Sequence, residues 1–163
     1  WTPIAPHHGT PIEGDDPGGI EADTDLGNLL SAGIFLIKPN EHETKILTGI
    51  AVIDLDSAKQ AAEKLQGFGI TNVLITAGAN GAYLFSPETQ THIPIPQIDV
   101  GGEKDETGCG DQTMAALCAL LQDGKQINEA SAQAVLAGTL QFYRAGIQPV
   151  KRDDLIAAQG YLK

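Results

Sequence analysis

The hydrophobic positions of the chain form short apolar runs that are separated by stretches with helical spacing. Residues 34–37, 73–76 and 82–85 are apolar runs of strand length, which is typical of buried strands. Residues 91–98 alternate between apolar and polar positions but contain prolines, so this segment can only be an edge strand. The Ala-Asn-Gly sequence at residues 79–81 predicts a hairpin turn, because Asn-Gly readily adopts positive φ.

Helical spacing follows the first of these strands and returns between the later ones. Residues 40–47 predict a short helix that ends at Gly49. Ser57 and Gln60 have the spacing of a capping box, with Ser57 as the N-cap of a helix that runs to about Phe68. Further helices are expected over residues 111–121, from an Asn128 cap through Phe142, and over residues 153–162.

This order of elements predicts the fold class. Strands that alternate with helices of about ten residues indicate an α/β sheet, parallel in the main, with an antiparallel hairpin attached. In such sheets, ligands bind outside the carboxyl ends of the strands. The loops expected there are residues 38–40, residues 76–78 and the stretch before Asp111.

The first part of the chain differs from the rest. Residues 1–33 are rich in Gly, Pro and acidic residues and show little periodicity, so we expect an irregular segment. His7 and His8 lie in it without a third ligand nearby, which favours a loop over a metal site. Residues 34–163 are expected to form the folded unit, with no second domain.

Composition and charge narrow the possible functions. The chain has 163 residues and 42% hydrophobic residues, which suits one globular domain. Ten Lys and Arg stand against 21 Asp and Glu, a net charge of −11, which argues against nucleic-acid or membrane-surface binding. An acidic protein can still bind phosphates through backbone N–H groups and a divalent metal.

Cysteine content and hydropathy bear on the compartment. Cys109 and Cys118 are too few for a disulfide scaffold and lack zinc-site spacing, so a cytoplasmic protein is expected. The longest apolar run, residues 114–121, is too short to span a membrane.

The most distinctive motif is residues 105–111, Asp-Glu-Thr-Gly-Cys-Gly-Asp, which leads directly into a helix. Glycines at positions 108 and 110 let the backbone approach a ligand, and the N–H groups of a helix N-terminus attract an anion. Asp111 is then placed to accept a proton from a hydroxyl beside that anion, as in phosphoryl transfer. The alternative is a tight turn with Asp111 as an ordinary N-cap.

Two further motifs carry the same ambiguity. Asn40 and Glu43 have the spacing of a capping box, but their oxygens could also hold Mg²⁺ through waters. Residues 76–81, Thr-Ala-Gly-Ala-Asn-Gly, are either only a hairpin turn or a turn whose Thr hydroxyl and glycine backbone face the phosphates of a nucleotide.

Cys109 lies at a helix N-terminus, which lowers the pKa of a thiol, so it is either a spacer or a nucleophile.

Four blocks of the sequence together resemble one family. Residues 36–43, Leu-Ile-Lys-Pro-Asn-Glu-His-Glu, are similar to the K-P-N-x-x-E block of the ribokinase (PfkB) family of carbohydrate kinases. Residues 73–81 resemble its T-x-G-x-x-G strand and turn, and residues 105–111 its D-T-x-G-A-G-D signature. Residues 144–149 resemble its closing R-x-G-A-x-P. The blocks occur in the family's order and cover about residues 34–150.

The resemblance implies a ribokinase-like layered sheet flanked by helices and a role for each matching residue. Asp111 would be the base that activates a sugar hydroxyl. The backbone of Gly108, Cys109 and Gly110 would form the anion hole for the γ-phosphoryl group. The nucleotide site would be lined by Thr76, Gly78 and Gly81.

The resemblance also implies cofactors and partners. ATP would be the phosphoryl donor, with Mg²⁺ and the phosphates positioned by Asn40 and Glu43. Asp105 and Thr107, with the backbone near Gly146, would match the family's monovalent-cation site, which favours K⁺. The acceptor would be a small sugar, and neither a nucleic acid nor a membrane is expected as a partner.

The sequence departs from the family pattern at several positions. Glu106 replaces a usual Thr, and Cys109 replaces a usual Ala. Gln112 stands where a small residue is common and could intrude on the substrate pocket. Val135 stands where many members carry an Asn near the adenine, so the nucleotide preference stays open.

Length is the largest departure, because family members are about twice as long. The chain would therefore carry the ATP-binding and catalytic half, residues 34–163, without most of the sugar pocket and the lid. An open sheet edge is expected, which would suit a homodimer or a larger protein. A kinase of vitamin alcohols from the same superfamily and a non-catalytic nucleotide-binding module remain alternatives.

Overall fold

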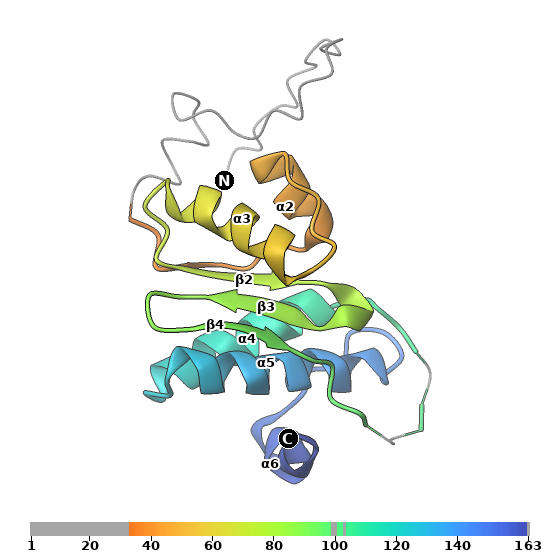
Figure 1. Cartoon of the computed structure of the whole chain (residues 1–163). Helices are drawn as coiled ribbons and strands as arrows, with labels where there is room; N and C mark the ends of the chain where they lie inside the picture. Colours follow the sequence, from red (N-terminus) through yellow and green to blue (C-terminus); the bar gives the residue numbers. More distant parts are fainter. Residues whose placement is uncertain (1–32, 99–100, 103, 163) are drawn as a thin grey trace, which may run out of the picture.

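The computed structural model describes residues 33–98, 101–102 and 104–162. They form a sheet with helices on both faces, which confirms the predicted α/β fold class (Figure 1). The strands in their spatial order are β1 (Leu36–Ile37), β2 (Asn72–Thr76), β3 (Ala82–Phe85) and β4 (Gln90–Ile93). The irregular segment predicted for residues 1–33, including His7 and His8, lies outside the described residues except for Gly33.

The pairing of the strands is less parallel than the sequence suggested. In the described part of the chain, β1 and β2 run parallel, whereas β3 is antiparallel to both β2 and β4. The reason is the short connections that follow β2 and β3, since short turns can join only antiparallel neighbours. β4 ends at Ile93, directly before Pro94, and lies at an edge as predicted.

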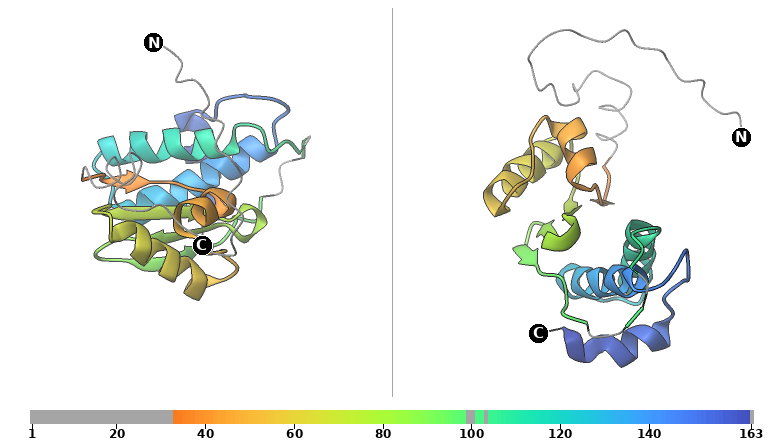
Figure 2. Two further views of the ribbon diagram at one scale, coloured as in Figure 1. Left: turned by 90° about the horizontal axis from the view of Figure 1, so that it is seen from above. Right: turned by 90° about the vertical axis from the view of Figure 1, so that its right-hand side faces the viewer.

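The helices form two layers around the sheet. Helices α2 (Glu41–Thr48) and α3 (Leu55–Gln66) cover one face, and α4 (Cys109–Gln122) and α5 (Ile127–Phe142) cover the other (Figure 1). Helix α6 (Arg152–Ala158) lies beyond α4 and α5, as the right-hand view of Figure 2 shows. Short 3-10 turns, η1 (Gly78–Asn80) and η2 (Gln159–Tyr161), complete the described elements.

The central strands are buried on both faces, and their alternation divides the core into two clusters. Val73 and Ile75 of β2 pack with α3, whereas Leu74 packs with residues of α4 and α5. β3 repeats the pattern, because Phe85 faces the α3 side and Leu84 the α5 side. A strand covered by helices on both faces is apolar throughout, which explains the short apolar runs in the sequence.

The helices begin a few residues away from their predicted starts, most clearly at α3 and α5. The N-cap of α3 is Asp54, which accepts a hydrogen bond from the backbone N–H of Ser57 at 2.8 Å, while Ser57 Oγ bonds back to the N–H of Asp54 at 3.0 Å. Ser57 is therefore the third residue of the helix, because Asp54 offers the same box one turn earlier. Helix α5 begins after Gln126, and Asn128 lies within its first turn.

The connection between β2 and β3 is longer than an Asn-Gly hairpin turn. It folds as η1, with positive φ at Gly78 and Gly81 but not at Asn80. A β-carbon on Gly81 would lie 2.1 Å from the carbonyl oxygen of Ile93, so this glycine permits the close approach of the turn to the end of β4.

β1 ends the sheet on its other side within the described residues, in agreement with the expected open edge. The strand is short, and the neighbouring Phe35 is 58% exposed. Among the residues that the structure describes, no helix is both long and apolar enough to cross a membrane.

Candidate functional site

The loops singled out in the sequence meet at one end of the sheet. Asn40, just after β1, forms a parallel bridge with Thr76 at the end of β2, and Thr76 donates its N–H to the carbonyl of Pro39 at 2.9 Å. From the same loop, the side chain of Lys38 reaches the start of α4, where its Nζ lies 3.4 Å from the position of a β-carbon on Gly110. The three loops therefore lie around one region.

The first turn of α4 presents backbone donors. Gly108 is the N-cap in the left-handed conformation, with φ of 77°, and no side chain caps the helix. The N–H of Cys109 bonds to the carbonyl of Glu106 at 3.3 Å. In the described part of the chain, the N–H groups of Gly110 and Asp111 have no acceptor. Of the three N–H groups expected to form the anion hole, that of Cys109 is engaged, whereas those of Gly108 and Gly110 have no acceptor among the described residues, and that of Asp111 is available beside them.

Asp111 is not an N-cap, because it is the third residue of α4 and Gly108 holds the capping position. Its exposed carboxylate stands in the first turn, where the helix dipole favours a negative charge. The next residue, Gln112, points elsewhere: its amide pairs with the backbone of Val150, accepting from N–H at 2.9 Å and donating to the carbonyl at 3.4 Å. Gln112 therefore ties α4 to the segment before α6.

Lys38 is a candidate site residue that the sequence reasoning missed. The residue was noted only as part of its motif, because the sequence does not tell which way a side chain at the end of a strand points. The structure places it half-buried, with its ammonium next to Gly110 in the first turn of α4. Positive charge and backbone donors at one point suit a phosphate group.

The thiol of Cys109 does not have the character of a nucleophile. Burial raises its pKa above the ordinary 9.0, and the negative charges of Asp105 and Glu106 raise it further. A helix N-terminus lowers a thiol pKa, so the expected lowering is overcome here by burial and like charge. Of the two interpretations of Cys109, the structure favours the spacer.

Asn40 and Glu43 form the capping box in full. Glu43 donates its N–H to Asn40 Oδ1 and accepts the N–H of Asn40 on Oε2, both at 2.8 Å. Both side chains are exposed, and Glu43 Oε1 has no partner among the described residues. The same residues can therefore cap α2 and still offer oxygens to a hydrated ion.

The fit to Mg²⁺ follows from this donor set. Within the described residues, no cluster of three or more His, Cys, Asp or Glu side chains could enclose a metal. Mg²⁺ commonly keeps several waters and binds one or two carboxylates together with substrate phosphates. An exposed Glu43 beside the β1–β2 strand ends fits that mode of binding.

The nucleotide-site residues expected on the β2–β3 turn are placed unequally. Thr76 is half-buried at the end of β2, and Gly78 is exposed, with open space where a β-carbon would be. Gly81 is buried against Ile93. Thr76 and Gly78 can face a ligand, whereas Gly81 shapes the turn from behind. Val135, expected near the adenine, is buried in the core at 5% exposure.

Asp105 braces the loop that leads into α4. Its Oδ1 accepts the N–H of Thr107 and its Oδ2 accepts the N–H of Gly146, each at 2.8 Å. Hydrogen bonds hold the pKa of Asp105 below its ordinary 3.8. The largest contributions come from the side chain and then the backbone of Thr107, and the backbone of Gly146 adds to them. Asp105 thereby connects the loop before α4 to the loop after α5.

A second residue that the sequence reasoning missed makes the same connection. Gln141 of α5 is 1% exposed, and its Nε2 donates to the carbonyl of Gly146 at 2.7 Å and to that of Thr107 at 3.4 Å. The sequence offers no signal that singles out Gln141, because α5 carries other polar residues such as Gln133 and Thr139.

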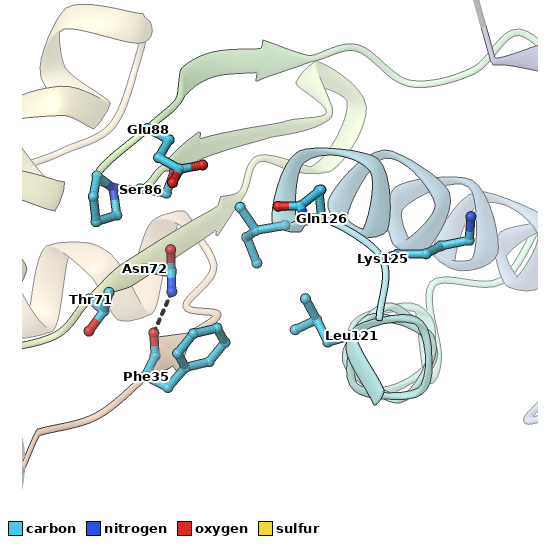
Figure 3. A pocket seen from close by; sticks show the side chains of 10 residues that line it. Phe35, Thr71, Asn72, Ser86, Glu88, Leu121, Lys125 and Gln126 are labelled. Carbon is cyan, nitrogen blue, oxygen red and sulfur yellow. Dashed lines mark hydrogen bonds between the residues drawn. The ribbon is translucent and has the colours of Figure 1, made fainter. Parts of the chain in front are cut away.

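The structure also has a cavity of about 540 Å³, but it lies at the opposite end of the sheet (Figure 3). It is lined by residues before β1 and β2, by the β3–β4 turn and by the α4–α5 connection, including Phe35, Asn72, Glu88 and Lys125. None of the predicted site residues lines it. The candidate site is therefore an exposed surface at the strand ends, defined by its chemistry rather than by an enclosed volume.

Comparison with known proteins identifies the family. The chain matches the pfkB family of carbohydrate kinases over residues 4–153. Ribokinase of Arabidopsis thaliana is 32% identical over 142 residues, which cover 85% of this chain and 36% of that protein. Deoxyribokinase of Salmonella typhi is 28% identical over 110 residues, 68% of this chain and 35% of that protein. The chain belongs to the pfkB family of carbohydrate kinases, as the motifs predicted.

Solved structures confirm the ribokinase-like fold. Arabidopsis thaliana ribokinase complexed with ribose and ATP has a TM-score of 0.71 at 27% identity, over 83% of this chain and 42% of that one. Phosphofructokinase-2 from Escherichia coli in complex with potassium has a TM-score of 0.73 at 24% identity, over 84% and 44%. The chain thus spans about a third of the length of the curated relatives and under half of these structures.

Proposed function

We propose that residues 34–163 form the ATP-binding and catalytic half of a carbohydrate kinase, which transfers the γ-phosphoryl group of ATP to a sugar hydroxyl. The observation that carries the proposal is the first turn of α4, where the N–H groups of Gly110 and Asp111 have no acceptor among the described residues and Lys38 Nζ lies 3.4 Å from the position of a β-carbon on Gly110. Family membership and the likeness to a ribokinase that binds ribose and ATP support the same class.

The proposed step assigns the proton and the electrons as follows. Asp111 takes the proton of the sugar hydroxyl, and the hydroxyl oxygen forms a bond to the γ-phosphorus. The bond from that phosphorus to the bridging oxygen breaks, and ADP leaves with the electron pair. Gly110, Asp111 and Gly108 N–H groups, with Lys38, balance the charge that develops on the phosphoryl oxygens.

The nucleotide would lie across the ends of β1 and β2. Thr76 and Gly78 would contact it, and Gly81 would keep their turn in place. Asn40 and Glu43 would position Mg²⁺, which, when bound, neutralises part of the phosphate charge.

The substitution Asp111→Asn tests the proposal in the protein that carries this chain. Losing a positioned base lowers turnover by about 10²–10⁴-fold, while ATP binding stays within about threefold of wild type. Sugar-dependent ADP release and calorimetry measure the two quantities. The substrate panel includes sugars and vitamin alcohols, so that the second kind of acceptor is tested in parallel. Turnover by the variant at the wild-type rate would contradict the role of Asp111.

A non-catalytic nucleotide-binding module is the second candidate, favoured by the exposure of Asn40, Glu43 and Asp111, because catalytic sites ordinarily exclude water from the reacting groups. It predicts that ATP and Mg²⁺ bind without ADP release in the presence of any sugar or vitamin alcohol. Acceptor-stimulated ADP release excludes this candidate.

A further inference from the structure

The residues expected to bind a monovalent cation are already joined to one another by protein donors. The expected ligands lie on the loop before α4, at Asp105 and Thr107, and on the loop after α5, near Gly146. Both carboxylate oxygens of Asp105 accept backbone N–H groups at 2.8 Å, one from each loop. This carboxylate therefore makes the bridge between the loops without help from an ion.

The carbonyl oxygens of the two loops face a buried amide. Gln141 Nε2 donates to the carbonyl of Gly146 at 2.7 Å, a normal hydrogen bond, and to that of Thr107 at 3.4 Å, a longer and weaker one. Carbonyl oxygens only accept hydrogen bonds, so the amide must turn its nitrogen, not its oxygen, toward them. Gln141 is 1% exposed, so water does not supply these bonds instead.

This donor set does not suit K⁺. Potassium sites are built from oxygens, typically backbone carbonyls, that converge on the ion in place of its water. Here an N–H donor stands between the carbonyls of Thr107 and Gly146, where those oxygens converge. A cation next to this N–H group would be repelled by its positive end.

We propose that the side-chain amide of Gln141 takes the place of the monovalent cation and holds the loop before α4 to the loop after α5. Gln141 is a positioning residue, since it reaches the first turn of α4 through Thr107 and the N-cap Gly108. Gln141 lies at the site proposed for the kinase function. The tests that measure ATP affinity rest on that proposed function, whereas the tests that measure melting temperature do not. A protein that is indifferent to K⁺ is the direct consequence of this role of Gln141.

The wild-type protein provides the first test. Its melting temperature and its affinity for ATP with Mg²⁺ are measured in KCl and in tetramethylammonium chloride at equal ionic strength. We expect the melting temperature to agree within about 1 °C and the dissociation constant within about twofold. A clear rise in melting temperature or affinity with KCl would overturn the proposal, because K⁺ would then bind the folded protein.

The substitution Gln141→Glu provides the second test, because it keeps the size of the side chain but exchanges the N–H donor for an oxygen. Three oxygen groups then face one another, which is the arrangement a cation requires. At pH 8 in tetramethylammonium chloride, we expect the melting temperature to fall by several degrees, and KCl to restore at least about half of that loss. A variant that melts like wild type in both salts would contradict the role of the amide.

Gln133→Glu is the matched control. Gln133 lies on the same helix at 7% exposure, but its amide bonds to Glu129 within α5 at 3.1 Å, away from both loops. Any loss of stability in this variant should not respond to KCl. A response equal to that of Gln141→Glu would assign the effect to a new charge on α5 and overturn the proposal.

The design separates this inference from the proposed function. If ATP does not bind, the kinase proposal fails, while the melting temperatures in the two salts still decide the role of Gln141. If Gln141→Glu does not fold, the comparison of the two salts on the wild-type protein decides it. ATP binding that depends on K⁺ would keep the kinase proposal and remove this one.

Discussion

The two loops that would contact ATP differ in how their conformations are held. The loop at Asn40 is fixed by neighbours in sequence, through the reciprocal bonds between Asn40 and Glu43. The loop from Asp105 to Gly110 is fixed from a distance, by Gly146, by Gln141 and by the packing of α4 on α5. The first loop is thus a local structure, whereas the second depends on the whole layer beneath the sheet.

This difference matters because the second loop carries the N–H groups and the carboxylate proposed for the chemistry. A positional error of a fraction of an ångström there would cost more than one at the capping box. Substitutions in α5, at a distance from the Asp105–Gly110 loop, should therefore disturb the conformation of that loop and weaken nucleotide binding. The same substitutions should leave the loop at Asn40 unchanged.

The strongest test of this contrast is Gly138→Ala. A β-carbon on Gly138 of α5 would lie 2.2 Å from Thr113 Oγ1 and 3.1 Å from the carbonyl of Cys109, so Thr113 must turn and give up its bond to Cys109, or α4 must shift. We expect the free energy of unfolding to fall by about 1–3 kcal/mol and ATP affinity to drop with it. Urea denaturation and calorimetry measure the two effects.

Gly160→Ala is the control for this substitution, since nothing lies within 4 Å of a β-carbon there. It should leave both quantities unchanged. If Gly138→Ala bound ATP as tightly as this control, the proposed dependence of the loop on α5 would be wrong.

Lys38→Met tests the contact between the two loops. The substitution removes the ammonium near Gly110 but keeps most of the side-chain length. Loss of one charge-assisted hydrogen bond to a phosphate weakens ATP binding about tenfold, with little change in stability. Lys59→Met on the exposed surface of α3 is the matched control in the same calorimetric titration. Equal affinities of the two variants would exclude a phosphate contact by Lys38.

Glu43→Gln separates capping from metal positioning. Glutamine can still accept the N–H of Asn40 and complete the capping box, but it lacks the negative charge. We expect the free energy of unfolding to stay within about 0.5 kcal/mol of wild type, while the affinity for ATP with Mg²⁺ falls about fivefold. Unchanged affinity in a Mg²⁺ titration would leave Glu43 with a capping role alone.

Asp105→Asn gives the smallest effect and reports on pH. Because the folded-state pKa of Asp105 lies below its ordinary 3.8, its ionised form stabilises the fold. This stabilisation is complete above the unfolded-state pKa and is lost as the pH falls through the folded-state value. Stability measured between pH 7 and pH 2.5 should therefore fall less steeply in the variant. Identical slopes would contradict the bonds from Thr107 and Gly146.

The same contrast explains what the sequence could predict. The capping box at Asn40 is a local pattern, and it appears in the structure with the expected residues. The meeting of Asn40 with Thr76 followed from a general rule, because parallel strands place their carboxyl ends at one edge. The family could be recognised because its motifs lie in these local segments.

Long-range contacts could not be read in the same way. Asp54 and Ser57 both have the spacing to begin a capping box, and the structure uses Asp54. The sequence suggests that Gln112 could intrude on the substrate pocket, but in the structure its amide pairs with Val150, 38 positions away. Gln141 is one of several polar residues of α5, and its contact with Thr107, 34 positions away, arises only in the fold.

The most direct test of the account follows backbone amide resonances of the ¹⁵N-labelled chain during titration with ATP and Mg²⁺. If the first turn of α4 holds the phosphates, the N–H signals of Gly110 and Asp111 shift most, with those of Gly78 and Lys38 next. Signals from the cavity at the other end of the sheet, such as that of Gln126, stay in place. Shifts centred on that cavity, with Gly110 and Asp111 unchanged, would contradict the assignment.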